Sequence, residues 1–119
     1  MKKILFVILS LFLFSIPDYS AENVYRGLKS ILYDGNKAIG KNALIHANLL
    51  EVDFTKKIFK IMDFKGLSAI IRFTENQVAL VKKYNSFAYY DFSFKIIKVD
   101  RTPSEPARVE GRIEGELIM

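Results

Sequence analysis

Apolar and polar residues alternate along several short segments, and this alternation is the feature that most limits the fold of the chain. Residues 109–117 read VEGRIEGEL, so every second position is Val, Gly, Ile or Leu, and the positions between them are Glu or Arg. A period of two residues is typical of a β-strand with one buried face and one solvated face. The stretches 43–54 and 88–99 show the same alternation. We therefore predict three strands that supply much of the core.

Two of these segments change phase by one residue near their middle. The apolar positions shift between Leu49 and Leu50 in the first segment, and between Ile96 and Ile97 in the second. A one-residue slip is what a β-bulge produces, and bulges coil a strand strongly. The slips favour a barrel or a strongly curved sheet.

Three shorter apolar segments, 58–64, 69–73 and 78–84, are separated by polar connections of two to four residues. Short connections favour consecutive antiparallel hairpins. The predicted fold class is therefore mainly β, an antiparallel meander of six to eight strands forming a small barrel or strongly curved sheet. Residues 22–33 have two interpretations. We expect a strand closed by a turn at 34–36, and the alternative is an α+β fold with an N-terminal helix at 22–33 packed on the sheet.

The N-terminal segment has the pattern of an export signal. Two lysines precede thirteen residues, 4–16, that are apolar except for two serines, and Pro17 ends the run. This is the pattern of a secretory signal peptide, and the run is shorter than the roughly 20 residues of a spanning helix. We predict a signal peptide at 1–21 and a single β-rich domain at 22–119. The protein is then periplasmic, in the cell envelope or secreted, and the alternative is membrane anchoring by an uncleaved 4–16.

The composition excludes several kinds of chemical site. The chain has no Cys and a single His, His46, which excludes disulfide scaffolds, thiolate zinc sites and sites with several imidazoles. The acids show no paired-carboxylate or calcium-loop spacing, and the glycines form no phosphate-binding loop. We expect no catalytic residue, no metal and no cofactor, and we interpret His46 as a solvent-facing or hydrogen-bonded strand residue.

Aromatic side chains are the main candidates for ligand binding. Tyr90, Phe92 and Phe94 occupy alternate positions of one predicted strand, where they would line a barrel interior or an aromatic-rich sheet face. Gly111 and Gly115 lie on the apolar side of the last predicted strand. Glycines there indicate a close backbone approach, with an open concave face for a ligand as the alternative.

Lysines are the second group with a candidate role. Six of them lie mostly beside predicted turns: Lys56, Lys57, Lys60, Lys65, Lys82 and Lys83. Lysines protect sheet edges from aggregation, and the functional alternative is contact with an anionic envelope surface. The partners we expect are an apolar small ligand, another envelope protein or an anionic envelope surface. Predicted export excludes nucleic acid.

Several short motifs follow one another in a suggestive order. Tyr25-Arg-Gly27 comes first, then Gly40-Lys-Asn-Ala43, then Asp53-Phe54 with a lysine turn, and finally the alternating segment 110–117. This order resembles the small β-barrel of transferrin-binding-protein-type surface proteins. The resemblance implies an eight-stranded-barrel-like architecture. It carries over no ligand, because the binding residues of that family do not map onto matching positions here.

These observations predict an exported small β protein that acts as a non-enzymatic binding module of the bacterial envelope or secreted fraction. The alternative is a structural envelope protein held by an uncleaved N-terminal hydrophobic anchor, without a small ligand. An enzyme of unknown class is the third option.

Overall fold

The computed structural model describes residues 24–102 and 110–118, so the predicted signal peptide at 1–21 lies outside the described residues. The elements in chain order are β2 (Val24–Tyr25), α2 (Leu28–Asp34), the 3-10 helix η1 (Gly35–Ala38), β3 (Asn42–Asp53), β4 (Ile58–Met62), β5 (Ser68–Arg72), the 3-10 helix η2 (Glu75–Gln77), α3 (Val78–Val81), β6 (Tyr89–Thr102) and β7 (Glu110–Leu117).

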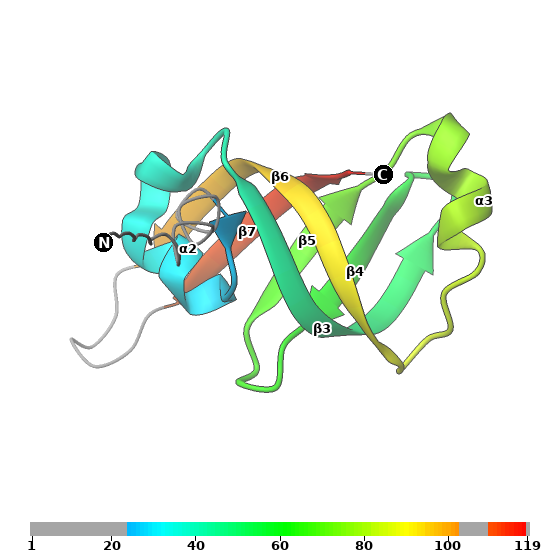
Figure 1. The fold of residues 1–119 in the computed structure, drawn as a ribbon, viewed down its shortest axis with the longest axis horizontal. Helices are drawn as coiled ribbons and strands as arrows, with labels where there is room; N and C mark the ends of the chain where they lie inside the picture. Colours follow the sequence, from blue (N-terminus) through cyan, green and yellow to red (C-terminus); the bar gives the residue numbers. More distant parts are fainter. Residues whose placement is uncertain (1–23, 103–109, 119) are drawn as a thin grey trace, which may run out of the picture.

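The strands form a closed barrel, which confirms the mainly β prediction (Figure 1). Their order is β2-β3-β4-β5-β7-β6, and β3 also pairs with β6, so five strands close the barrel and β2 is added beside β3. The meander holds for β3, β4 and β5, after which β7 inserts between β5 and β6 and runs parallel to β5. This connectivity, with a helix before the fourth barrel strand, is that of the five-stranded OB fold. The fold by itself assigns no function.

Bulges in β3 and β6 let the sheet close on itself. The pairing register shifts between Leu49 and Glu51 in β3, and between Ile96 and Lys98 in β6. Both predicted phase slips are therefore confirmed as bulges. The N-terminal half of β3 pairs with β6 and its C-terminal half with β4, which requires the strong coiling that a bulge supplies.

Residues 22–33 correct the preferred strand interpretation. Only Val24–Tyr25 is a strand, whereas Leu28–Asp34 is an α-helix, as the alternative interpretation held. Leu28, Ile31 and Leu32 are fully buried, and their spacing places them on one face of a helix. This face packs against β6 and β7 at one end of the barrel (Figure 1).

Residues 78–84 correct a second strand prediction, because α3 occupies Val78–Val81 and directly follows η2. A capping box starts this helical segment. Thr74 accepts a hydrogen bond from the backbone of Gln77, and the Gln77 side chain accepts one from the Thr74 N–H at 2.9 Å. The buried Gln77 amide also donates to the carbonyl of Leu117 in β7 at 2.9 Å. In the described part of the chain, no helix has the length and apolar character needed to cross a bilayer.

Large apolar side chains occupy the barrel interior. Phe59 and Phe92 lie with ring centroids 5.3 Å apart, and Tyr84 packs edge-on against Phe92 at 5.3 Å. The largest side chains that are at most about 1% exposed are Phe59, Phe92, Phe94, Leu28, Ile31, Leu32, Ile45, Leu49, Ile61, Ile71, Ile96 and Ile113. The barrel is thus packed like an ordinary protein core.

Candidate functional site

Of the three residues predicted to bind a ligand, Tyr90 and Phe92 belong to one aromatic cluster, and Phe94 lies in the same apolar core. Phe92 and Phe94 are fully buried in the barrel core. Tyr90 is half-buried, packs against Tyr84 with centroids 4.7 Å apart, and accepts a hydrogen bond from the N–H of Asn85 at 2.8 Å. Burial, with a smaller effect of Tyr90, raises the pKa of the Tyr84 phenol. Ligand binding by these residues stays a prediction, and it would require the core to open.

Two hollows lie on the outer face of β4, β5 and β7. One, of about 370 Å³, is lined by Lys60, residues 68–70 and residues 112–114. The other, of about 190 Å³, shares Lys60 and Ile70 with it and adds Glu51, Asp53 and Lys56. OB folds bind oligonucleotides and oligosaccharides on the corresponding strands.

The side chains on this outer face do not suit such ligands. Six outward residues of β4 and β5 are aliphatic, hydroxyl-bearing or charged, and none is aromatic: Ile58, Lys60, Met62, Ser68, Ile70 and Arg72. Arg72 is also paired with Glu114 at 3.0 Å. Binding of single-stranded nucleic acid relies on stacking of bases on aromatic rings, and the two strands lack this platform.

A third hollow lies between the start of α2 and the β4–β5 turn, and we call it the α2 cleft. Its volume is about 360 Å³, and it is lined by residues 26–30 and Tyr33 on one side, Ile45 and His46 of β3, and residues 63–65 of the turn. Two of its aromatic side chains are largely exposed, Tyr33 at 52% and Phe64 at 79%. The α2 cleft therefore combines a preformed hollow with exposed aromatic surface.

Asp63 shapes the β4–β5 turn that forms one wall. Its buried carboxylate accepts hydrogen bonds from the N–H groups of Lys65 and Leu67, both at 2.9 Å. Gly66 takes a positive φ of 89°, which a residue with a side chain rarely adopts. The turn holds Phe64 and Lys65 at its exposed tip, with the Lys65 ammonium 5.9 Å from the Phe64 ring centroid. Backbone N–H groups of the turn thus satisfy the Asp63 carboxylate.

The opposite wall comes from the first turn of α2. Gly27 precedes the helix with an extended backbone, and burial of one helix face leaves Arg26, Lys29 and Ser30 exposed. Within the described residues, neither Arg26, Lys29 nor Lys65 forms an ion pair with a carboxylate. The α2 cleft therefore presents three cations beside a single acid that is already hydrogen-bonded.

His46 lies on β3 beside this cleft. Its Nδ1 atom is 2.8 Å from Asp91 Oδ1 on β6, and its ring stacks on Tyr89 with centroids 5.4 Å apart. The histidine and the aspartate are about two-thirds exposed. The prediction of a solvent-facing, hydrogen-bonded histidine is confirmed. Its acidic partner was missed, because the pairing of His46 with Asp91 depends on the register of two strands far apart in sequence.

An imidazole can serve as a general base or as a metal ligand, and both roles need partner groups. Ser30 also lines the α2 cleft, but no hydrogen bond joins it to His46 among the described residues. Nucleophilic catalysis needs such a contact between nucleophile and base. Across residues 24–102 and 110–118, no cluster of three or more potential metal ligands is found.

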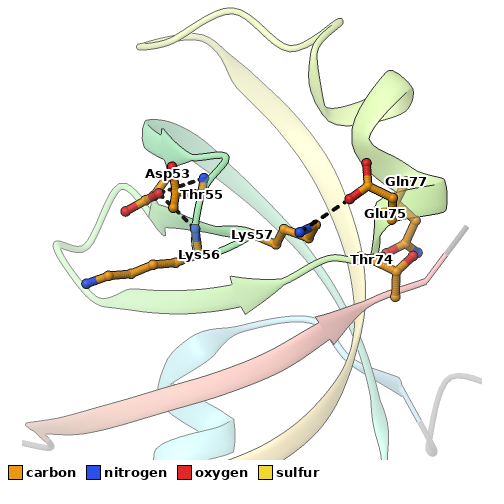
Figure 2. A network of polar contacts seen from close by, with 7 residues as sticks. All are labelled: Asp53, Thr55, Lys56, Lys57, Thr74, Glu75 and Gln77. Carbon is orange, nitrogen blue, oxygen red and sulfur yellow. Dashed lines mark hydrogen bonds and ion pairs between the residues drawn. The ribbon is translucent and has the colours of Figure 1, made fainter.

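The β3–β4 turn contains Lys56 and Lys57, two of the lysines for which the sequence suggested a role in binding an anionic surface. Asp53 accepts hydrogen bonds from the N–H groups of Thr55 and Lys56 at 2.9 and 3.0 Å (Figure 2). Lys57 takes a left-handed backbone conformation, and its ammonium lies 3.3 Å from the Glu75 carboxylate of η2. This network fixes the turn against the helical segment. Lys57 is therefore engaged within the fold, unlike the cations of the α2 cleft.

Comparison of the chain with models of protein families, with curated proteins and with solved structures finds no match. The geometry of the molecule is therefore the basis for assigning a function. Of the three hollows, the α2 cleft is the one lined by largely exposed aromatic side chains, and its cations have no acidic partner among the described residues.

Proposed function

We propose that this protein is a non-enzymatic binding module of the bacterial envelope or secreted fraction, and that its ligand occupies the α2 cleft rather than the barrel interior. The observation that carries the proposal is a filled barrel beside an open cleft of about 360 Å³. This volume is within the range of about 300–1,000 Å³ for ligand sites. The envelope or secreted location is taken from the N-terminal sequence pattern.

The walls of the cleft support binding without a large rearrangement. Buried residues anchor α2, and Asp63 fixes the turn that carries Phe64. Ligand sites that are formed in advance avoid the entropic cost of ordering loops on binding. Aromatic side chains supply apolar contact area, and cations supply charge-assisted hydrogen bonds to anionic groups.

Native mass spectrometry of the protein purified from its own host tests the proposal. We expect a bound molecule that is retained by wild type and lost from a Phe64→Ser variant. Phe87→Ser is the matched control, because Phe87 is similarly exposed at 75% and is not part of the cleft. Circular dichroism verifies that both variants fold.

Two outcomes would contradict the proposal in different ways. Loss of the bound molecule from a conservative core variant, Phe92→Leu, with retention in Phe64→Ser would place the site inside the barrel. Repeated recovery of bare wild-type protein that also binds no lipid vesicles would contradict the binding function and favour a structural protein held at the membrane.

A further inference from the structure

We propose that the α2 cleft faces an anionic phospholipid surface, with Arg26, Lys29 and Lys65 binding lipid phosphate groups and Phe64 entering the interface. This inference rests on the proposed binding function and specifies its ligand. The occupant is a bilayer surface, whereas a free phosphorylated molecule is an outcome of the test below.

The charge of the cleft separates it from the other two hollows. Arg26, Lys29 and Lys65 line the cleft from two walls, and Asp63, the only acid among the described lining residues, accepts hydrogen bonds from two backbone N–H groups. The hollow of about 190 Å³ is lined by two acids and two lysines, so its charges balance, and the hollow of about 370 Å³ has two cations, Lys60 and Arg112, beside the acid Glu114. Phosphate groups on a membrane attract basic side chains within a Debye length of about 10 Å. Of the three hollows, the α2 cleft is the best complement to such a surface.

Phe64 supplies the apolar part of the contact. It is the most exposed large hydrophobic side chain described, at 79%, and it stands at the tip of a turn with Lys65 beside it. An exposed aromatic ring next to a cation suits the membrane interface, where the ring meets acyl chains and the cation remains at the phosphates. The structural role of Asp63 keeps both side chains pointing outward. The tip therefore combines the two forces that hold peripheral proteins on membranes.

The path of the chain also indicates that the end of the barrel with the α2 cleft faces the membrane. The described chain enters the barrel at Val24, two residues before Arg26 of the cleft. Residues 17–23 separate it from the apolar run at 4–16, and seven residues reach at most about 25 Å. If the apolar run is not cleaved, it would hold the Val24 end of the barrel near the bilayer. If it is cleaved, the residues of the α2 cleft alone would attract the protein to the membrane. α3, which Lys82 and Lys83 follow in the sequence, lies at the opposite end of the barrel from α2 (Figure 1).

Vesicle co-sedimentation tests this orientation. Protein from its own host is mixed with vesicles of phosphatidylglycerol and phosphatidylcholine in a one-to-two ratio, or of phosphatidylcholine alone. The readout is the ratio of the two partition coefficients, because a retained anchor contributes equally to both. We expect a clear preference for the anionic vesicles that weakens as salt is raised.

Variants separate the cleft from general positive charge. The triple variant Arg26→Gln, Lys29→Gln, Lys65→Gln should lose about fivefold in anionic partitioning per charge, or about a hundredfold in all. The triple variant Lys56→Gln, Lys82→Gln, Lys83→Gln removes the same charge from exposed positions outside the cleft and should lose far less. Phe64→Ser should lower partitioning about tenfold without a change in charge.

The failures of the two proposals are distinguishable. No preference for anionic vesicles, or equal losses in the two triple variants, overturns the membrane inference. If native mass spectrometry then shows a soluble anion that only the cleft variants lose, the proposed binding function stands, and the ligand of the cleft is that anion rather than a bilayer. If neither vesicles nor a small molecule is bound, both proposals fall.

Discussion

At the scale of single residues, close contacts in the last strand explain why two glycines interrupt its apolar face. Gly115 pairs with Ile71 on one side and Ile96 on the other. A Cβ atom at this position would overlap the ring of Phe94 and come within 3.0 Å of the Lys95 carbonyl. The sequence prediction of a close backbone approach is therefore confirmed, and the space beside Gly115 is filled by a side chain rather than left open.

Gly115→Ala should lower the free energy of unfolding by about 1–3 kcal/mol, because the added methyl group overpacks the core. Gly27→Ala is the matched control, since nothing lies within 4 Å of its Cβ position and its backbone is extended. Urea unfolding measures both variants. Equal stabilities of the two would show that the ring of Phe94 moves aside without cost.

Tyr25 gives a pH-dependent contribution to stability. Its hydroxyl donates to Asp34 Oδ2 at 2.5 Å, and this bond, with burial and the Asp34 charge, raises the pKa of Tyr25 to about 12. The folded state then holds the phenolic proton more tightly than the unfolded chain, where the pKa is about 10. The stabilisation is complete below about pH 10 and is lost as the pH rises through about 12.

Tyr25→Phe should remove the loss of stability that the Tyr25–Asp34 hydrogen bond causes between about pH 10 and about pH 12. Urea unfolding over this pH interval measures the effect. Tyr33→Phe, a change at an exposed tyrosine outside this hydrogen bond, should keep the wild-type profile. A Tyr25→Phe profile parallel to that of wild type would rule out the Asp34 bond as its origin.

At the scale of elements, short helical segments close the ends of the barrel because individual side chains tie them to strands. α2 is held by its buried apolar face, whereas η2 and α3 combine the buried Val81 with the polar contacts of Gln77. Gln77 is 7% exposed and links Thr74, where the segment starts, to Leu117 in β7. A segment this short has little helical stability of its own, so these contacts decide its conformation.

Gln77→Met should destabilise the protein by about 2 kcal/mol, because it leaves the Thr74 N–H and the Leu117 carbonyl without their partner. Asn76→Met, at an exposed neighbour in the same 3-10 helix, should change stability by less than about 0.5 kcal/mol. Chemical denaturation compares the two. Similar values for both variants would mean that water replaces the Gln77 contacts.

At the scale of the whole molecule, the packed barrel leaves its outer surface as the place for a partner. The core residues come from strands on every side of the barrel and from α2. The α2 cleft is assembled outside this core from three parts of the chain, and the entry of the chain at Val24 lies beside it. Because the cleft is on the surface, the cellular location of the protein determines which partners can reach it.

Export predicts a defined N-terminus. Mass spectrometry of the protein recovered from whole cells should find a chain that begins near Glu22, in the periplasmic or secreted fraction, because the apolar run at 4–16 has signal-peptide character. Intact Met1 in the membrane fraction would identify an uncleaved anchor. Intact Met1 in the soluble cytoplasm would contradict both forms of the prediction.

Local sequence pattern was sufficient to predict the strands that carry the core and the positions of their bulges. Alternation is visible along β3, β6 and β7 because each strand buries one face and solvates the other, and a bulge shifts that phase by one residue. The same alternation of buried and exposed positions predicted that His46 lies on the solvent-exposed face of its strand. The capping box at 74–77 is also a local signal, although its neighbours Val78 and Val81 favoured a strand interpretation.

Which strands pair, and where the candidate site lies, could not be predicted from local pattern and depends on the fold of the whole domain. The insertion of β7 between β5 and β6, and the pairing of His46 with Asp91, depend on packing between segments far apart in the chain. The α2 cleft likewise joins residues 26–33, 45–46 and 63–65. Local periodicity records which side of a strand is buried, but it does not record the neighbour against which that side packs. Long-range packing therefore placed the three cations and Phe64 around one hollow.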